Sequence, residues 1–131
     1  MADMTKQRPK FLALHEIRLP LPGFVSILHR VSGAGLFLML PLLAYLLQLS
    51  LDPTPEGAAG FKALVGNPFI KLILFGLSWA YLHHFCAGIR FLLLDLHIGI
   101  EKQAARQSAT VVMAVSLALT LIVAMKFLGV F

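Results

Sequence analysis

The sequence has few charged or reactive side chains for its length of 131 residues. Only 13% of the residues are charged, and Cys86 is the single cysteine. One cysteine excludes an internal disulfide and a cysteine-based zinc cluster. The chain also has no internal repeat and no low-complexity tract. We therefore expect one domain, 1–131, with no room for a soluble catalytic module.

Apolar side chains dominate instead. They make up 59% of the residues and give a mean hydropathy of +0.86, whereas soluble domains carry about 25% charged residues. Three apolar stretches each exceed the ~20 residues that a helix needs to cross a ~30 Å hydrocarbon core. Their length favours helices over buried strands. The prediction is an all-α membrane protein with transmembrane helices at about 22–51, 68–95 and 106–131.

The first apolar stretch is too long for the apolar part of a signal peptide, and no small-residue cleavage site follows it. We therefore expect a retained helix. Pro41 should kink it, because proline removes a backbone hydrogen bond. The turn-forming segment 52–57 ends it, and residues 58–65 suit a short interfacial helix.

The net charge of +5 does not indicate nucleic-acid binding, because the basic residues form no binding face. They cluster before the first span (Lys6, Arg8, Lys10, Arg18) and around the second connection (Arg90, Lys102, Arg106). The positive-inside rule then places the N-terminal segment 1–21 in the cytoplasm or at its interface. After three crossings, the C-terminus should lie in the periplasm.

Two adjacent histidines, His83 and His84, interrupt the apolar stretch 72–89. Ionisable side chains inside a span are by default functional. His84 lies about eleven residues, or ~16 Å, before the expected end of the second helix, which is close to the bilayer midplane. A neutral imidazole there suits two roles: a hydrogen bond to a neighbouring helix, or ligation of a metal centre such as haem iron.

The surroundings of His84 favour ligation. Gly88 follows one turn later on the same face, and a flat porphyrin needs a small residue beside its axial ligand. Phe91 is placed to pack on the same edge. His83 is rotated by about 100° from His84, so both cannot ligate one iron from a regular helix. We interpret His83 as a hydrogen-bonding residue at a subunit contact.

The first helix carries a second polar cluster. Ser26, Arg30 and Gly33 share one face, with His29 beside them. Arg30 is either a snorkelling arginine or, with Ser26, a donor set for an anionic or carbonyl-bearing group, such as a haem propionate or a quinone. Asp95 is expected at the same depth as Arg30. It either forms an ion pair or shares a proton-carrying water chain with Arg30, or it is a solvated residue at a helix end.

A six-coordinate haem needs two axial ligands, and the chain has one well-placed deep histidine. His29 lies too near the surface to reach the same iron as His84. The second ligand would therefore come from another polypeptide. The small residues scattered along the third helix suit a larger bundle. A transporter subunit is disfavoured, because the third helix offers no continuous polar path.

These residues resemble a known family. The chain contains Arg8-Pro9, the element Ser-Ile-Leu-His-Arg-Val-Ser-Gly at 26–33, and His84 followed by Gly88-Ile89-Arg90 and Asp95. In combination they are similar to the cytochrome b subunit of bacterial succinate dehydrogenase, the membrane anchor of respiratory complex II. The resemblance covers nearly the whole chain, including its three-span layout.

The resemblance implies a multi-pass protein of the bacterial inner membrane that serves electron transport and the tricarboxylic acid cycle. The chain would form half of a helical bundle that holds one haem b, with a second hydrophobic anchor subunit forming the other half. An iron–sulfur subunit would help to complete the ubiquinone pocket, and a flavoprotein subunit would oxidise succinate. The chain would thus belong to an enzyme without holding a complete active site. The alternatives are a haem-free structural anchor and the equivalent subunit of a fumarate reductase.

The resemblance also implies roles for individual residues. His84 matches the axial ligand of the haem iron, and His29 and Arg30 match positions that approach the haem propionates. Ser26 and Arg30 match positions that line the ubiquinone pocket. The family often has a second histidine directly after Gly-Ile-Arg, where this chain has Phe91.

Overall fold

The structure, a computed structural model, describes residues 16–129. Within this range the chain is helical and contains no strand. The helices are α1 (Leu21–Leu38), α2 (Leu40–Leu51), α3 (Pro55–Gly66), α4 (Pro68–Asp95) and α5 (Lys102–Phe127). Most of the predicted interfacial segment 1–21 lies outside the described residues.

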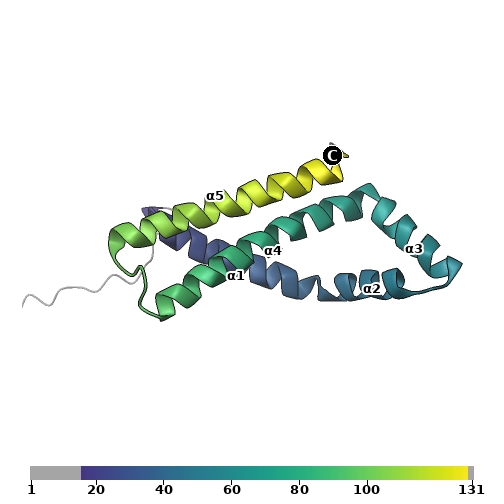
Figure 1. Cartoon of the computed structure of the whole chain (residues 1–131), viewed down its shortest axis with the longest axis horizontal. Coiled ribbons are helices and arrows are strands. Elements are labelled where there is room, and N and C mark those ends of the chain that lie inside the picture. The colour runs from purple at the N-terminus through teal and green to yellow at the C-terminus, as the bar shows by residue number, and fades with distance from the viewer. Residues whose placement is uncertain (1–15, 130–131) are drawn as a thin grey trace, which may run out of the picture.

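Three of these helices are long and apolar enough to cross a membrane: α1, α4 and α5. This confirms the predicted all-α fold with three spans. Figure 1 shows that α1 and α2 run end to end, that α4 returns beside α1, and that α5 runs back beside α4. The short helix α3 joins α2 to α4. Because α4 packs against both α1 and α5, its side chains can take part in a site between α4 and α1 and in another between α4 and α5.

The kink expected at Pro41 is present as a break of the first helix at Met39. Pro41 has no N–H, so the hydrogen bond to the carbonyl one turn earlier is missing. The ladder continues on both sides of the break, from Met39 N to Gly35 O at 3.1 Å and from Leu43 N to Met39 O at 3.0 Å. The first apolar stretch is therefore two helices, α1 and α2, of which only α1 is long enough to count as a span.

The later helices begin at capped positions. The Thr54 side chain accepts a hydrogen bond from Gly57 N at the start of α3, and the Asn67 side chain accepts from Phe69 N and Ile70 N at the start of α4. Such caps satisfy backbone N–H groups that have no partner within the helix. Thr54 therefore marks the start of α3, and Asn67 marks both the end of α3 and the start of α4 at Pro68.

The third long helix differs from the expected range 106–131 at both ends. It begins at Lys102, because the polar residues that precede the apolar stretch are themselves good helix formers. Its helical residues end at Phe127, and Gly129 then adopts a positive φ of 69°. A glycine in this conformation commonly follows the end of a helix.

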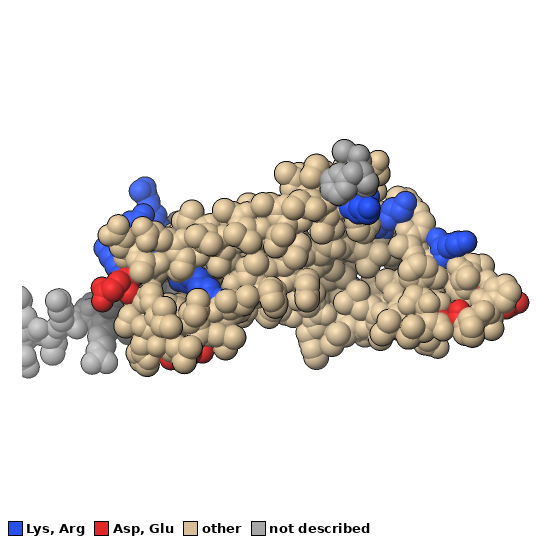
Figure 2. Space-filling model, in the orientation of Figure 1, with Lys and Arg blue, Asp and Glu red and all other residues tan. Residues whose placement is uncertain are grey.

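The core of the described chain is small. Val25 of α1, Ala87 of α4, and Ala109 and Val112 of α5 are buried together. Small side chains at these positions let the helix backbones approach closely. Many large apolar side chains are exposed instead, and Figure 2 shows the visible Lys, Arg, Asp and Glu atoms mainly towards the two ends. An apolar middle and charged ends are the pattern expected of a chain that lipid or other helices surround.

Candidate functional site

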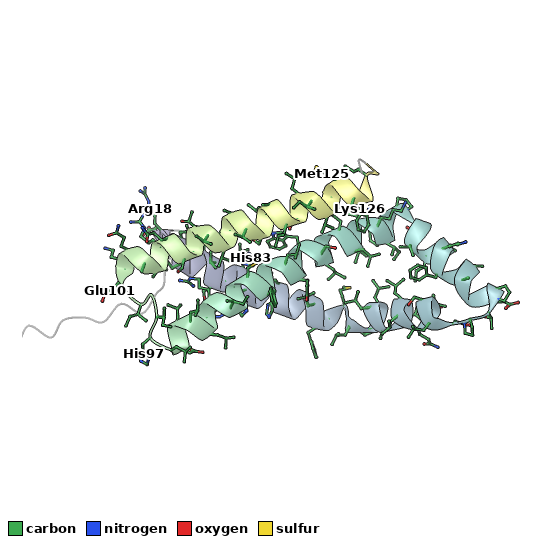
Figure 3. All side chains as sticks on the ribbon, in the orientation of Figure 1. Arg18, His83, His97, Glu101, Met125 and Lys126 are labelled. Atoms are coloured by element: carbon green, nitrogen blue, oxygen red, sulfur yellow. The ribbon has the colours of Figure 1, made fainter. Side chains whose placement is uncertain are left out.

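The two adjacent histidines of α4 face different helices. His83 is fully buried, at 0% exposure, and Figure 3 shows it midway along the bundle. Its Nδ1 lies 3.4 Å from Ser116 Oγ on α5, and its ring stacks on Trp79 at 5.5 Å between ring centroids. The interpretation of His83 as a residue at a subunit contact is therefore wrong. Its partner is a serine of its own chain, one helix away.

His84 faces α1 instead. Its Nδ1 lies 3.0 Å from the backbone oxygen of His29 and 3.3 Å from Ser32 Oγ. A carbonyl oxygen can only accept, so Nδ1 carries the proton and donates it. The Ser32 hydroxyl donates to the same carbonyl at 2.9 Å, which leaves its oxygen lone pairs available to Nδ1–H. In the neutral form of the ring, Nε2 of His84 is then the nitrogen without a proton, and it has no hydrogen bond among the described residues.

Gly33 on α1 makes the room for this ring. A Cβ at that position would lie 2.7 Å from His84 Cε1 and 3.1 Å from Nδ1. These separations are shorter than van der Waals contact, so any larger residue would displace the imidazole. Gly35, two residues later, would meet nothing within 4 Å. The close approach of α1 to His84 thus depends on one particular glycine.

His29 covers one face of the His84 ring. The two imidazoles are stacked, with centroids 4.1 Å apart and planes 14° from parallel. Phe91 also contacts His29, with its ring centroid 5.0 Å from that of His29. Gly88 lies beneath His29, since a Cβ there would be 3.8 Å from His29 Nε2. In this structure the space beside Gly88 is therefore lined by His29.

Ser26 and Arg30 are the donors of this region without a protein partner. Ser26 is half-buried and Arg30 is exposed, and neither forms a hydrogen bond or an ion pair within residues 16–129. The other serines of that range each donate to a backbone carbonyl three or four residues earlier. A serine or threonine inside a helix commonly makes this bond. The Ser26 hydroxyl is thus available to a bound molecule.

Asp95 is the last residue of α4 and is exposed. It forms no ion pair with Arg30 in the structure of residues 16–129. The direct ion pair is therefore absent from this structure, while the shared water chain and the solvated helix end both stay predictions. A role for Asp95 in proton transfer stays a prediction.

Sequence reasoning missed two polar contacts. Ser32 is buried at 2% exposure and contacts His84 from α1. Arg90 is buried at 6% exposure, and its Nε donates to Ser108 Oγ on α5 at 2.9 Å. The signal for Arg90 was a charged residue inside a span. Its partner could not be named from the sequence, because the rotation of α5 relative to α4 was unknown.

The fold and these contacts together define a class: a helical membrane protein in which one helix pair carries a serine, an arginine and an imidazole nitrogen without hydrogen bonds among the described residues. Residues 4–123 match the family described as succinate dehydrogenase/fumarate reductase transmembrane subunit. Because the match spans most of the sequence, the chain belongs to that family.

Individual relatives point the same way. The chain is 36% identical over 113 residues to the succinate dehydrogenase cytochrome b556 subunit of Coxiella burnetii, covering 86% of this chain and 90% of that one. It is 31% identical over 129 residues to the protein of the same name from Paracoccus denitrificans, covering 97% and 98% of the two chains. A Rickettsia felis protein of that name is 29% identical over 120 residues, covering 92% and 93%.

Proposed function

We propose that this chain is the cytochrome b anchor subunit of a succinate:quinone oxidoreductase. In this role it binds one haem b together with a partner anchor subunit and contributes to the ubiquinone-reduction site. Membership of the transmembrane subunit family supports the anchor role, and the relatives named cytochrome b556 support the haem. The basic residues near the start of α1 and between α4 and α5 support a cytoplasmic N-terminus and a periplasmic C-terminus.

The observation that carries the haem proposal is the hydrogen bonding of His84. Its Nδ1–H donates to the His29 carbonyl at 3.0 Å, so Nε2 keeps the lone pair that a metal requires. Ligating histidines commonly donate their other N–H in this way, which fixes the tautomer and the ring orientation. His84 would therefore hold the iron, with His29 and Arg30 near the propionates. The bound haem would supply a one-electron carrier beside the quinone pocket.

The stacking of His29 on His84 supports the proposal that a second ligand comes from a partner chain. The rings of His29 and His84 are stacked face to face, with centroids 4.1 Å apart and planes 14° from parallel. This contact leaves no room for a metal between the two rings, so His29 would not share the iron with His84 in this arrangement. His83 faces α5 and would not share that iron either.

The quinone proposal rests on Ser26 and Arg30. Both carry donors without a hydrogen bond among the described residues, and both lie on the α1 side of the bundle. In the proposed site they donate hydrogen bonds to a quinone oxygen and stabilise the negative charge that develops there during reduction. The partner anchor and an iron–sulfur subunit would complete the pocket, and a flavoprotein subunit would oxidise succinate. The names of the relatives favour succinate oxidation over fumarate reduction as the working direction.

The haem proposal is tested by the reduced-minus-oxidised absorption spectrum of the purified complex. His84→Ala should abolish the b-type band while the complex still assembles. His97→Gly is the matched control: it removes an exposed histidine whose φ of 61° glycine tolerates well, and it should leave the band unchanged. A full b-type band in the His84→Ala complex would overturn the proposal. A complex without haem in the parent protein would favour the structural anchor.

The quinone proposal is tested by succinate:quinone reductase activity in assembled complexes. Ser26→Ala and Arg30→Ala should each lower the rate of quinone reduction by roughly 100-fold, the cost of removing one donor from a developing negative charge. Ser78→Ala is the control, because the Ser78 hydroxyl is already bonded to Leu74 O at 2.8 Å. Unchanged quinone reduction with intact assembly would contradict this assignment.

A further inference from the structure

A groove between α4 and α5 lies on the side of α4 that the proposed haem and quinone sites do not use. Its volume is about 530 Å³, and its lining is mostly apolar. Leu93 and Leu94 contribute from α4, and Val111 and Val115 from α5. Because Ile98 of the connecting loop also lines it, the groove lies towards the end of the bundle where α4 stops and α5 starts (Figure 1).

Arg90 forms the charged part of the groove wall. Its Nε donates to Ser108 Oγ at 2.9 Å and its Nη2 to Ala105 O at 3.3 Å. Both partners are neutral, and no carboxylate within residues 16–129 forms an ion pair with Arg90. A buried cation without an opposite charge is costly, even where hydrogen bonds and an aromatic ring such as that of Phe91, 5.5 Å away, compensate part of the cost. The guanidinium is thus positioned and hydrogen-bonded, yet its charge has no counter-charge from the described chain.

A second, polar groove adjoins the first on the opening turns of α5. It is lined by Lys102, Gln103, Arg106 and Gln107, and Gln107 also lines the apolar groove. Lys102 and Arg106 are exposed, and neither forms an ion pair within the described residues. No acidic residue lines either groove. Figure 2 shows basic atoms at this end of the molecule and further basic atoms recessed among uncharged ones nearby.

We propose that these two grooves form one binding site for an anionic phospholipid. Lys102 and Arg106 bind the phosphate of the headgroup, and Arg90, in the wall of the apolar groove, attracts the same negative charge from deeper in the span. An acyl chain lies along the apolar groove against Leu93 and Val111. The order of the parts matches a lipid: cations stand at the helix end, where headgroups lie, and apolar walls follow towards the middle of the span. Basic pockets between transmembrane helices favour anionic headgroups for this reason.

The charges predict the selectivity. Each basic residue near a membrane surface favours an anionic lipid by about 1 kcal/mol, which corresponds to about fivefold in affinity. Lys102 and Arg106 together should therefore give phosphatidylglycerol roughly a 25-fold advantage over zwitterionic phosphatidylcholine. A neutral ligand such as a quinone would leave three cations uncompensated. The site does not depend on haem or quinone binding, since those proposals use the α1 side of α4.

The test is native mass spectrometry of the purified complex that contains the full chain, after delipidation and titration with phosphatidylglycerol or phosphatidylcholine. The parent complex should prefer phosphatidylglycerol about 25-fold. The exposed pair Lys102→Gln and Arg106→Gln should abolish most of that preference without disturbing the packing of α4 on α5. Lys62→Gln with Lys71→Gln removes two exposed cations outside both grooves and should leave the preference unchanged.

Two results would overturn the proposal. One is equal binding of the two lipids by the parent complex. The other is an undiminished phosphatidylglycerol preference in the Lys102→Gln and Arg106→Gln variant. That result is expected if another subunit, and not a lipid, fills the groove. Inorganic phosphate distinguishes a lipid from a free anion: it should not displace phosphatidylglycerol, because the acyl chain contributes to binding. Displacement at equal concentration would contradict the lipid assignment.

Discussion

The two sides of α4 differ in what its polar side chains meet: serine hydroxyls on the α5 side, and chiefly a backbone carbonyl on the α1 side. On the α5 side, Nδ1 of the fully buried His83 meets Ser116 while its Nε2 has no hydrogen bond among the described residues, and Arg90 meets Ser108. On the α1 side, His84 uses one nitrogen for the His29 carbonyl and leaves the other without a hydrogen bond among the described residues. Adjacent residues of one helix thus serve different purposes, because a rotation of about 100° separates them.

This difference separates polar groups that hold the bundle together from those that are left available. Ser108 and Ser116 each donate to a carbonyl of their own helix while accepting from α4. Ser26 and Arg30, on the α1 side, have no such bonds. Polar groups inside a membrane that lack a partner are costly, so the unbonded Ser26 and Arg30 support the proposed binding of a molecule or another subunit beside α1. The contacts of His83 and Arg90 with α5 pack the two helices together, and the α1 side carries the residues of the proposed haem and quinone sites.

The largest effect is expected where α1 touches His84. Gly33→Ala places a Cβ 2.7 Å from His84 Cε1 and must displace the ring, so haem affinity should fall by about 100-fold, as for other changes that misplace a ligand. Gly35→Ala is the matched control, since nothing lies within 4 Å of its Cβ. Haem content per complex measures both. Equal haem content in the two variants would show that the position of His84 does not matter for haem.

The next largest effect is expected for the contact of His83 with α5. His83→Ala removes a fully buried side chain and leaves Ser116 without its partner from α4, which should destabilise the complex by about 2 kcal/mol. The b-type spectrum of the folded fraction should stay unchanged. Leu92→Ala, at a position that is 66% exposed, is the control for shortening an apolar side chain of α4. Denaturant titration in mixed micelles measures the stability. A lost spectrum at full stability would reverse the roles of the two histidines.

A smaller effect is expected for the support of His84. Ser32→Ala removes the hydroxyl 3.3 Å from Nδ1, but the His29 carbonyl still fixes the tautomer. Haem affinity should fall by about tenfold, the lower end for a residue behind a metal ligand. Ser50→Ala deletes a similar hydroxyl, bonded to Leu47 O at 2.8 Å, and should have no effect on haem. A loss as large as that of Gly33→Ala would mean that the serine, not the carbonyl, fixes the tautomer.

The smallest effect lies outside both helix contacts, in the turn before α3. Thr54→Ala removes the cap on Gly57 N and should cost about 1 kcal/mol of stability, with no change in haem content. Hydrogen bonds from Thr54 to Asp52 lower the pKa of that carboxyl below its ordinary value. The contribution of Asp52 to stability is therefore present above its ordinary pKa and is lost as the pH falls through the lowered value.

Denaturant titrations at neutral and acidic pH measure both the stability lost in Thr54→Ala and the acid-dependent contribution of Asp52. Asp52→Asn removes the titrating group and keeps an oxygen that accepts from Thr54, so this variant should lose the small acid-dependent part of the stability. Acid sensitivity equal to that of the parent protein would contradict the role of Asp52. Haem loss in Thr54→Ala would contradict the separation of this turn from the α1 side.

Much of the fold could be predicted from the sequence because it depends on local properties. Apolar length gave the three spans, and Pro41 gave the break in the first of them. The different directions of His83 and His84, about 100° apart, followed from helix geometry alone. The partners on other helices did not, since Ser116, Ser32 and Ser108 meet α4 only through the rotation and depth at which α1 and α5 pack. Small residues along a helix permit several such rotations, so the sequence does not select one.

The candidate site divides in the same way. The residue types of Ser26, Arg30 and His84 indicated donors and a ligand, and the structure adds which of their polar atoms have no hydrogen bond among the described residues. The α5-facing role of His83 was mispredicted, because a buried histidine looks the same in sequence whether its partner lies in the same chain or in another. The expectation that His29 lies at a different depth from His84, too near the surface to reach the same iron, was also wrong, since the two rings are stacked. Their relative depth depends on how α1 packs against α4.

The most direct test of the central claim is rescue of the haem spectrum by free imidazole in two variants of the complex. His84→Gly opens a space at the proposed ligand position, and His83→Gly opens one on the α5 side. The account predicts that His84→Gly loses the six-coordinate b-type spectrum and that added imidazole restores it, while His83→Gly keeps the spectrum without imidazole. Restoration by imidazole in His83→Gly, with an unperturbed spectrum in His84→Gly, would contradict the assignment of His84 as the ligand.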